Sequence, residues 1–447
     1  MKKLLSLILA VCLVLGLASF ATAEDALPTL DQIVLGENTD LTAKVHFVYH
    51  RTDLAGDDGK LAGYVKEFKE IYPNIEVEYE LITDFAENAL LRIGNNDWTI
   101  MGIPTVDKDE LSKYFIPLGS LETLDGLYNF MSQWAFDGTC YGIPSTGNAN
   151  GILYNKRIFA EAGVTELPKT PEEFMNALRA VKEKTDAIPL YTNYAAGWTM
   201  GAWDAYIGVA ATGKDTYMQQ ELPLAKDPFA DQGNSTGPYA VYKILYDAAK
   251  EKLIEDDYTT TDWEGCKPML NNGQIASMVL GSWAFTQMRD AAGGEHPEDV
   301  GYMAFPITID GKQYAPAGPD YCFGINVQAS REEKLASLYY LKWLTEKSGF
   351  AYSEGGVPID KKGEYPDLYA AFDGIAMVAD ADALPGEATL LSDLNKESEL
   401  NINAGGNEKV QKIVEHGFNG DMEYDAIMAE WNEAWSDAQK TLNVEVK

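Results

Sequence analysis

The residues that most often carry out catalysis or bind metal ions are few in this chain, and their spacing matches no known motif. The four histidines are His46, His50, His296 and His416, and no two of them have the spacing of zinc ligands. Gly281-Ser282-Trp283-Ala284 lacks the second glycine of a nucleophile elbow. No phosphate-binding glycine loop or dinucleotide fingerprint occurs. We therefore expect no enzymatic activity, no cofactor and no metal site.

Carboxylates are the one reactive group in excess. There are 69 Asp and Glu against 35 Lys and Arg, which gives a formal net charge of −34 at pH 7. This charge disfavours nucleic acid as a partner. Acidic runs such as Glu255-Asp256-Asp257 and Asp380-Ala381-Asp382 are more typical of a solvated surface than of a calcium site. Two carboxylates far apart in sequence could still hydrolyse a glycoside, so an extracellular glycosidase stays an alternative.

The first residues predict export. Lys2 and Lys3 precede the apolar run Leu4–Leu17, and Ala21-Thr22-Ala23 is an A-x-A cleavage site. We expect a signal peptide over residues 1–23, cleaved after Ala23, and a mature protein that is extracellular, periplasmic or held at the cell surface. Lipidation at Cys12 is the second interpretation, but Val11 is bulky for a lipoprotein box. The three other cysteines allow one disulfide; they are Cys140, Cys266 and Cys322.

The elements that position the polar residues follow an α/β pattern. Alternating apolar residues predict strands over Lys44–Tyr49 and Ile75–Leu81, with residues 61–72 between them at helical spacing. Strand, helix and strand with short connections predict a parallel sheet covered by helices.

The later part of the chain continues the pattern. Thr170-Pro171-Glu172-Glu173 predicts the start of a helix, Ile188–Tyr191 a strand, and Ser330 with Glu333 a second capped helix. Trp431 and Trp435 stand four residues apart in a C-terminal helix, where core packing is the simpler interpretation.

Several segments, taken in order, resemble one known family. They are Phe68–Val77, Tyr141–Pro144, Leu153–Lys156, Phe159–Val164 with Pro168–Thr170, Gly273–Trp283, Gly301–Pro306, the helix after Ser330, and Gly355–Pro358. Together they resemble the family 1 extracellular solute-binding proteins of ABC importers, the group that includes maltose-binding protein. One departure is Gly94-Asn95-Asn96-Asp97-Trp98, which stands where the family often has a Gly-Asp-x-Pro-Asp turn.

The resemblance implies a two-lobed, periplasmic-binding-protein-like α/β fold with three interlobe crossings and a ligand cleft between the lobes. We place the crossings near Ser145–Asn150, Tyr302–Pro306 and Ser353–Asp360. The first lobe then comprises residues 24–146 plus 303–353, and the second comprises residues 150–300 plus 358–447.

The resemblance also implies a function. The chain would capture a carbohydrate, most simply an oligosaccharide, and deliver it as a monomer to a membrane-embedded ABC permease. A receptor for another solute, such as a polyamine or a peptide, is the alternative within this class. A sensor that presents the bound sugar to a membrane kinase would have the same sequence features.

A neutral sugar needs flat aromatic platforms and side chains that donate and accept hydrogen bonds. Trp283 matches the position where the family stacks an aromatic ring on its ligand, and Trp198 and Trp203 lie in a glycine-interrupted stretch after a predicted strand. Trp98 is a further aromatic candidate. The polar candidates lie in loops near the predicted crossings and strand ends; they are His50, Arg51, Asp53, Asn148, Asp320, Tyr321 and Glu354. For each tryptophan, core packing is the competing interpretation.

Two lobes joined only by crossings predict a motion. A ligand that contacts both lobes favours the closed form, because only that form makes both sets of contacts. Adding the correct sugar should therefore reduce the radius of gyration measured by small-angle X-ray scattering. A tight sugar complex with an unchanged scattering profile would contradict the two-lobe mechanism.

Overall fold

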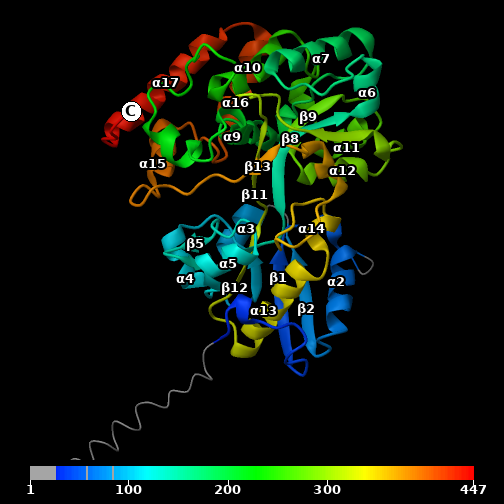
Figure 1. Cartoon of the computed structure of the whole chain (residues 1–447), viewed down its shortest axis with the longest axis vertical. Coiled ribbons are helices and arrows are strands. Elements are labelled where there is room, and N and C mark those ends of the chain that lie inside the picture. The colour runs from blue at the N-terminus through cyan, green and yellow to red at the C-terminus, as the bar shows by residue number, and fades with distance from the viewer. Residues whose placement is uncertain (1–26, 57–58, 83–84) are drawn as a thin grey trace, which may run out of the picture. The chain divides into compact units, whose positions relative to one another are not determined.

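Residues 27–447, apart from 57–58 and 83–84, are described by the structure, which is a computed structural model (Figure 1). The expected signal peptide, its cleavage site and Cys12 lie outside these residues. The chain forms two compact units, within which most of the close approaches between Cα atoms occur. Of the described residues, unit 1 holds those up to Leu127 together with Gln133–Ile143 and Cys322–Ser348. Unit 2 holds Tyr128–Ser132, Pro144–Tyr321 and Gly349–Lys447.

Unit 1 is built on a five-stranded sheet of order β2-β1-β3-β12-β7. Its strands are β1 (Ala43–Tyr49), β2 (Ile75–Leu81), β3 (Ile100–Gly102), β7 (Ile143–Pro144) and β12 (Cys322–Ile325). β1 pairs in parallel with β2 and with β3, whereas β12 is antiparallel to β3. The two strands predicted from alternation, and their parallel pairing, are confirmed. The carboxyl ends of β1 and β2 therefore lie at one edge of the sheet.

The remaining elements of unit 1 are helices and a small sheet. The helices are α2 (Lys60–Lys69), α3 (Phe85–Arg92), α4 (Leu111–Tyr114), α5 (Leu121–Leu127) and α13 (Arg331–Glu346), and the small sheet joins β4 (Gly119–Ser120), β5 (Ala135–Phe136) and β6 (Thr139–Cys140). Phe47 of β1 stacks on Tyr79 of β2 at 4.7 Å between ring centroids, and it meets Tyr340 of α13 edge-on. Ser330 forms the predicted capping box with Glu333 at the start of α13.

Unit 2 is organised around β8 (Gly147–Asn155), which is antiparallel to three strands. These are β9 (Ser277–Gly281), β10 (Val300–Met303) and β11 (Tyr314–Pro319), and β11 in turn pairs in parallel with β13 (Ala376–Val378). The segment predicted as a strand over Ile188–Tyr191 makes only single parallel bridges, from Ile188 to Ile275 and from Leu190 to Ile254. The sheet of unit 2 is therefore mainly antiparallel, unlike that of unit 1.

Helices cover the sheet of unit 2, as Figure 1 shows for α7, α10 and α16. The longer ones are α7 (Pro171–Lys184), α10 (Gly237–Lys250), α11 (Trp263–Asn271), α12 (Trp283–Arg289), α15 (Leu390–Ser398), α16 (Asn407–Asn419) and α17 (Tyr424–Thr441). The shorter ones are α6 (Lys156–Glu161), α8 (Trp198–Gly201), α9 (Val209–Thr212) and α14 (Phe350–Ser353), with 3-10 turns at Tyr194–Ala196 (η4), Ala202–Tyr206 (η5) and Asp367–Phe372 (η10). The predicted caps and core residues of these helices are confirmed: Thr170 accepts a hydrogen bond from the Glu173 amide, and Trp431 and Trp435 are buried.

Residues 128–132, 144–146, 303–321 and 349–353 were predicted for the first lobe and lie in unit 2. The longest of these segments is 303–321. We predicted this segment for the first lobe, but Ala317 pairs with Ala149 and Pro319 with Gly147, so β11 belongs to the sheet of unit 2. The chain leaves unit 2 after Tyr321 and not near Tyr302–Pro306. Cys140, Cys266 and Cys322 are all buried.

Among residues 27–447, less the two short gaps, no helix is long and apolar enough to cross a bilayer.

Candidate functional site

Trp283 owes its position to a tight turn between β9 and α12. β9 ends at Gly281 and α12 begins at Trp283, so one residue, Ser282, joins them. A Cβ atom on Gly281 would lie 2.6 Å from Nε1 of Trp283, which is too close for any side chain. The Ser282 hydroxyl accepts a hydrogen bond from the Ala149 amide at 3.1 Å and lies 2.9 Å from the Tyr369 hydroxyl. The Gly-Ser-Trp sequence therefore lets the indole fold back over its own turn.

Three indoles of unit 2 gather around this turn, and we call Trp198, Trp263 and Trp283 the indole cluster. The ring centroids lie 5.1 Å apart for Trp198 and Trp263, and 5.7 Å apart for Trp198 and Trp283 and for Trp263 and Trp283. Trp198 remains 39% exposed, although indoles are usually well buried. A half-exposed aromatic surface of this kind can stack on the C–H face of a sugar ring.

Sequence reasoning missed Trp263. It is the first residue of α11, whose N-cap Asp262 accepts a hydrogen bond from the Gly265 amide at 2.6 Å. The Lys267 ammonium lies 4.9 Å from the Trp263 ring centroid and pairs with Glu264. The only signal available was a tryptophan directly after a capping aspartate, which also suits a packed helix start.

Asn148, predicted from the first crossing, lies beside the indole cluster. The Ser282 hydroxyl donates to its Oδ1 at 3.4 Å, and Ser282 directly precedes Trp283. Asn150, two residues further along β8, pairs with Gly281 and has its Oδ1 3.1 Å from where a Cβ of Gly281 would stand. The structure therefore brings Asn148, Trp198 and Trp283 together, and it adds Trp263 and Asn150.

His50, Arg51 and Asp53 lie together in unit 1, after the carboxyl end of β1. Arg51 donates two hydrogen bonds to the Asp53 carboxylate, from Nε at 2.8 Å and from Nη2 at 2.7 Å. Burial acts to raise the pKa of Asp53, but the hydrogen bonds and charge of Arg51 outweigh it and lower the pKa. The His50 ring packs against Tyr49 and Phe85. A charged pair next to rings is suited to bind hydroxyl groups.

Two predicted tryptophans lie in the core. Trp98 is 2% exposed, donates from Nε1 to the Arg92 carbonyl at 3.1 Å and packs on Phe115. Trp203 is also 2% exposed and meets Phe305 edge-on. Their burial favours packing, which was the competing interpretation for each, and their part in ligand binding stays an untested prediction.

The last three candidates belong to unit 2. Asp320 follows β11, and its amide donates to the Thr146 carbonyl at 2.8 Å, while Tyr321 donates from its amide to the Asp320 carboxylate. Glu354 is buried at the end of α14, and its carbonyl accepts a bond of 3.5 Å from the Thr286 hydroxyl of α12. A ligand role for these residues also stays a prediction.

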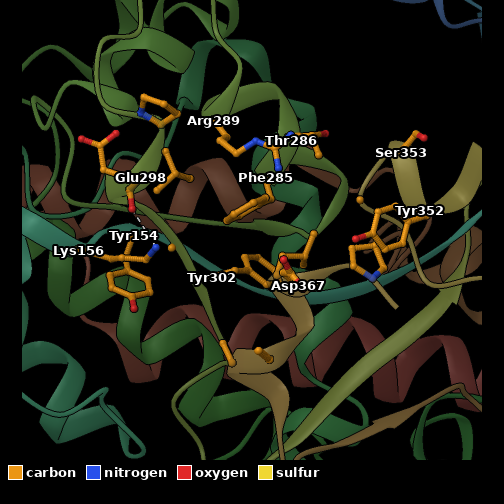
Figure 2. A pocket seen from close by; sticks show the side chains of 18 residues that line it. Tyr154, Lys156, Phe285, Thr286, Arg289, Glu298, Tyr302, Tyr352, Ser353 and Asp367 are labelled. Carbon is orange, nitrogen blue, oxygen red and sulfur yellow. Dashed lines mark hydrogen bonds between the residues drawn. The ribbon is translucent and has the colours of Figure 1, made fainter. Parts of the chain in front are cut away.

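A separate pocket of about 650 Å³ is lined in part by Phe285, Thr286 and Arg289 of α12. Figure 2 shows Lys156 and Glu298 at one end, Tyr352 and Ser353 at the other, and Phe285 between them. None of the predicted site residues lines this pocket. Within the described part of the chain, no group of three or more His, Cys, Asp or Glu residues is placed to hold a metal ion.

Comparison with known proteins places the chain among solute receptors. The family model for bacterial extracellular solute-binding proteins matches residues 52–349, which confirms the resemblance drawn from the sequence. The multiple sugar-binding protein of Streptococcus mutans is 24% identical over 341 residues, which is 73% of this chain and 77% of that protein.

Two solved structures from Bifidobacterium animalis subsp. lactis are more similar. One is a manno-oligosaccharide-specific solute-binding protein in complex with mannotriose, and the other is an ABC-transporter binding protein in complex with mannobiose. Each is 46% identical to this chain, has a TM-score of 0.87, and aligns over 93% of this chain and 99% of its own. The two-lobed α/β fold expected from the sequence is therefore confirmed.

The geometry of the indole cluster predicts what Trp283 does. Trp283→Ala should weaken carbohydrate binding by about 1–3 kcal/mol and leave the ligand-free protein nearly as stable, as expected for a ligand-facing ring. A core tryptophan would instead lose about 3–5 kcal/mol of folding stability. Isothermal titration calorimetry and chemical denaturation of the ligand-free variant measure the two effects.

Tyr352→Ala is the matched control, because Tyr352 is 43% exposed and lines the separate pocket, which no residue of the indole cluster lines. We expect this variant to keep the wild-type affinity. If Tyr352→Ala weakens binding while Trp283→Ala does not, the carbohydrate uses the pocket and the assignment to the indole cluster is wrong.

Proposed function

This chain belongs to the family of bacterial extracellular solute-binding proteins and is a carbohydrate-binding component of an ABC transporter, and we propose that its ligand is a manno-oligosaccharide. The observation that carries the ligand class is the 46% identity, over 93% of the chain, to a manno-oligosaccharide-specific receptor. The identity to receptors for raffinose is far lower, at 16%.

The indole cluster supports a carbohydrate ligand on physical grounds. A pyranose ring presents C–H groups on its faces, and these pack on flat aromatic surfaces. We propose that Trp198 and Trp283 stack on sugar rings and that Asn148 bonds a hydroxyl group, because its amide both donates and accepts. The proposed contacts of unit 1 are His50, Arg51 and Asp53, whose charges can bond further hydroxyl groups.

The proposal also covers the transporter partner of the protein and the fate of the bound sugar. The family and the similar structures are binding proteins, so we propose that the sugar is released unchanged to a membrane-embedded permease and that the receptor acts as a monomer. Incubating mannotriose with the purified protein should yield no mannose or mannobiose by chromatography.

We also propose that the exported protein starts at Glu24 and carries no lipid. The A-x-A site at Ala21-Thr22-Ala23 supports this cleavage. Intact-mass spectrometry of the exported protein should give the mass of residues 24–447. A diacylglyceryl group on an N-terminal Cys12 would contradict the proposal.

The ligand class is tested by titration calorimetry with mannobiose and mannotriose. We expect saturable binding of both and a raised melting temperature, because a ligand at a hundred times its dissociation constant stabilises the fold by about 2.7 kcal/mol. Maltotriose, raffinose, diacetylchitobiose, spermidine and a tripeptide serve as competitors. Binding of one of these without binding of mannosides would disprove the manno-oligosaccharide ligand.

A further inference from the structure

Glu255 is a buried carboxylate of unit 2 and is not among the proposed ligand contacts. It follows Ile254, which bridges in parallel to Leu190, and it is 4% exposed. Its Oε1 accepts hydrogen bonds from the Thr192 hydroxyl at 2.5 Å and from the Asn193 amide at 3.2 Å. Its Oε2 accepts from the Thr192 amide at 2.9 Å. One carboxylate therefore gathers three donors from two consecutive residues.

These two residues begin the segment that leads to the indole cluster, and we call residues 192–198 the platform loop. The Asn193 carbonyl accepts hydrogen bonds from the Ala196 amide at 3.1 Å and from the Thr199 hydroxyl at 2.8 Å. These contacts lie on either side of Trp198. A short chain of hydrogen bonds thus runs from the Glu255 carboxylate, through Asn193, to the backbone that carries the Trp198 indole.

The conformation of Asn193 in the platform loop is energetically unfavourable. Its backbone is left-handed, with φ 53° and ψ 41°, and the residue is fully buried. Neither atom of its side-chain amide has a hydrogen-bond partner among the described residues. Strained backbone and unpaired buried polar groups persist only where surrounding contacts impose them, and they concentrate at functional sites. The bonds from the Asn193 and Thr192 amides go to the charged Glu255 carboxylate. A second carboxylate, Glu415, accepts a hydrogen bond from the hydroxyl of Tyr194, the next residue of the loop.

We propose that Glu255 is a positioning residue, whose ionised carboxylate holds the platform loop in the conformation that presents Trp198 to the sugar. This inference rests on the proposed function, because it assumes that the indole cluster binds carbohydrate. Protonation would place a hydrogen on an oxygen that now faces N–H and O–H donors. The loop then loses at least one bond to a charged acceptor, and the affinity for the ligand falls.

The proposal predicts how ligand affinity and stability depend on pH. Burial raises the pKa of Glu255, and the bonds from Thr192 and Asn193 only partly offset this effect. The ligand affinity should therefore fall as the pH drops through this raised pKa. The stability should change in the opposite direction: the folded protein keeps the Glu255 proton where the unfolded chain has lost it, so the stability contribution of Glu255 is greatest in acid and falls as the pH rises.

Two buried titratable groups beside Glu255 do not change charge in the acid range. Tyr191 and Cys266 are the groups that act electrostatically with it, and burial raises the pKa of each to about 12. Asp256 and Asp257 follow it in sequence and are exposed. A pH effect from these aspartates would remain when Glu255 is replaced.

The experiment measures mannotriose affinity, from neutral pH into the acid range, for the wild type and three variants. Glu255→Gln should weaken binding at neutral pH by about tenfold, because one hydrogen bond to a charged group is lost. The same variant should no longer show the fall in affinity at low pH, which we call the acid limb of the profile. Thr192→Val removes only the hydroxyl donor to the carboxylate, which raises the pKa of Glu255, so the acid limb should move to higher pH. Asp256→Asn is the matched control and should keep the wild-type profile.

A readout without ligand separates this proposal from the proposed function. Tryptophan emission of the ligand-free protein should show a pH step in the wild type that is absent from Glu255→Gln and from Trp198→Phe. If that step appears but no mannoside binds at any pH, the ligand assignment fails and the positioning role stands. A wild-type affinity profile in both Glu255→Gln and Thr192→Val would overturn the positioning role. If Glu255→Gln and Asp256→Asn changed the pH profile of mannotriose affinity equally, the positioning role would also be overturned, because the change would then come from the loss of a negative charge alone.

Discussion

Strand β8 hydrogen-bonds along both edges, and the site of unit 2 depends on that pairing. Its register with β9 sets Asn150 opposite Gly281, and its register with β11 sets Ala149 opposite Ala317. Residues i and i+2 of a strand share a face, so Asn148 and Asn150 point the same way. The turn after Gly281 places Trp283 on the same face as these two asparagines. A slip of one residue in this register would turn the amides to the opposite side of the sheet.

The indole cluster shows how an exposed aromatic surface is tolerated before a ligand arrives. Leaving an indole in water forgoes part of the free energy gained by burying it. Trp263 and Trp283 reduce this loss by packing on Trp198, which remains 39% exposed. The rings are held edge-on or tilted to one another, geometries that the aromatic quadrupole favours. Mutual packing also limits their rotamers, so less conformational entropy is lost when a sugar stacks on them.

Two buried carboxylates of unit 2 are stabilised in different ways. Asp204 lies 2.6 Å from the Lys409 ammonium and also accepts from the Tyr242 hydroxyl, which ties η5 to α16 and α10. Glu255 is held by the amides and hydroxyl of Thr192 and Asn193, which are neutral. An opposite charge compensates for burial more strongly than neutral donors do. The first arrangement suits a rigid core, and the second suits a loop whose conformation can respond to protons.

The sequence by itself determined the α/β class, the parallel pairing of β1 with β2, the helix caps at Thr170 and Ser330 and the core role of Trp431 and Trp435. These features depend on periodicity and on contacts three or four residues apart, which the order of residues encodes directly. The family resemblance proposed Trp283 as a ligand contact from the local Gly-Ser-Trp sequence, and this role stays a prediction. Only the tertiary structure decided that Trp198 and Trp263 join Trp283, that Trp98 and Trp203 are buried, and that β11 belongs with β8. The surroundings of Trp198 and Trp203 depend on residues far along the chain, because Trp198 packs on Trp263 and Trp283 and Trp203 packs on Phe305. Residue type alone carries no record of such distant pairings.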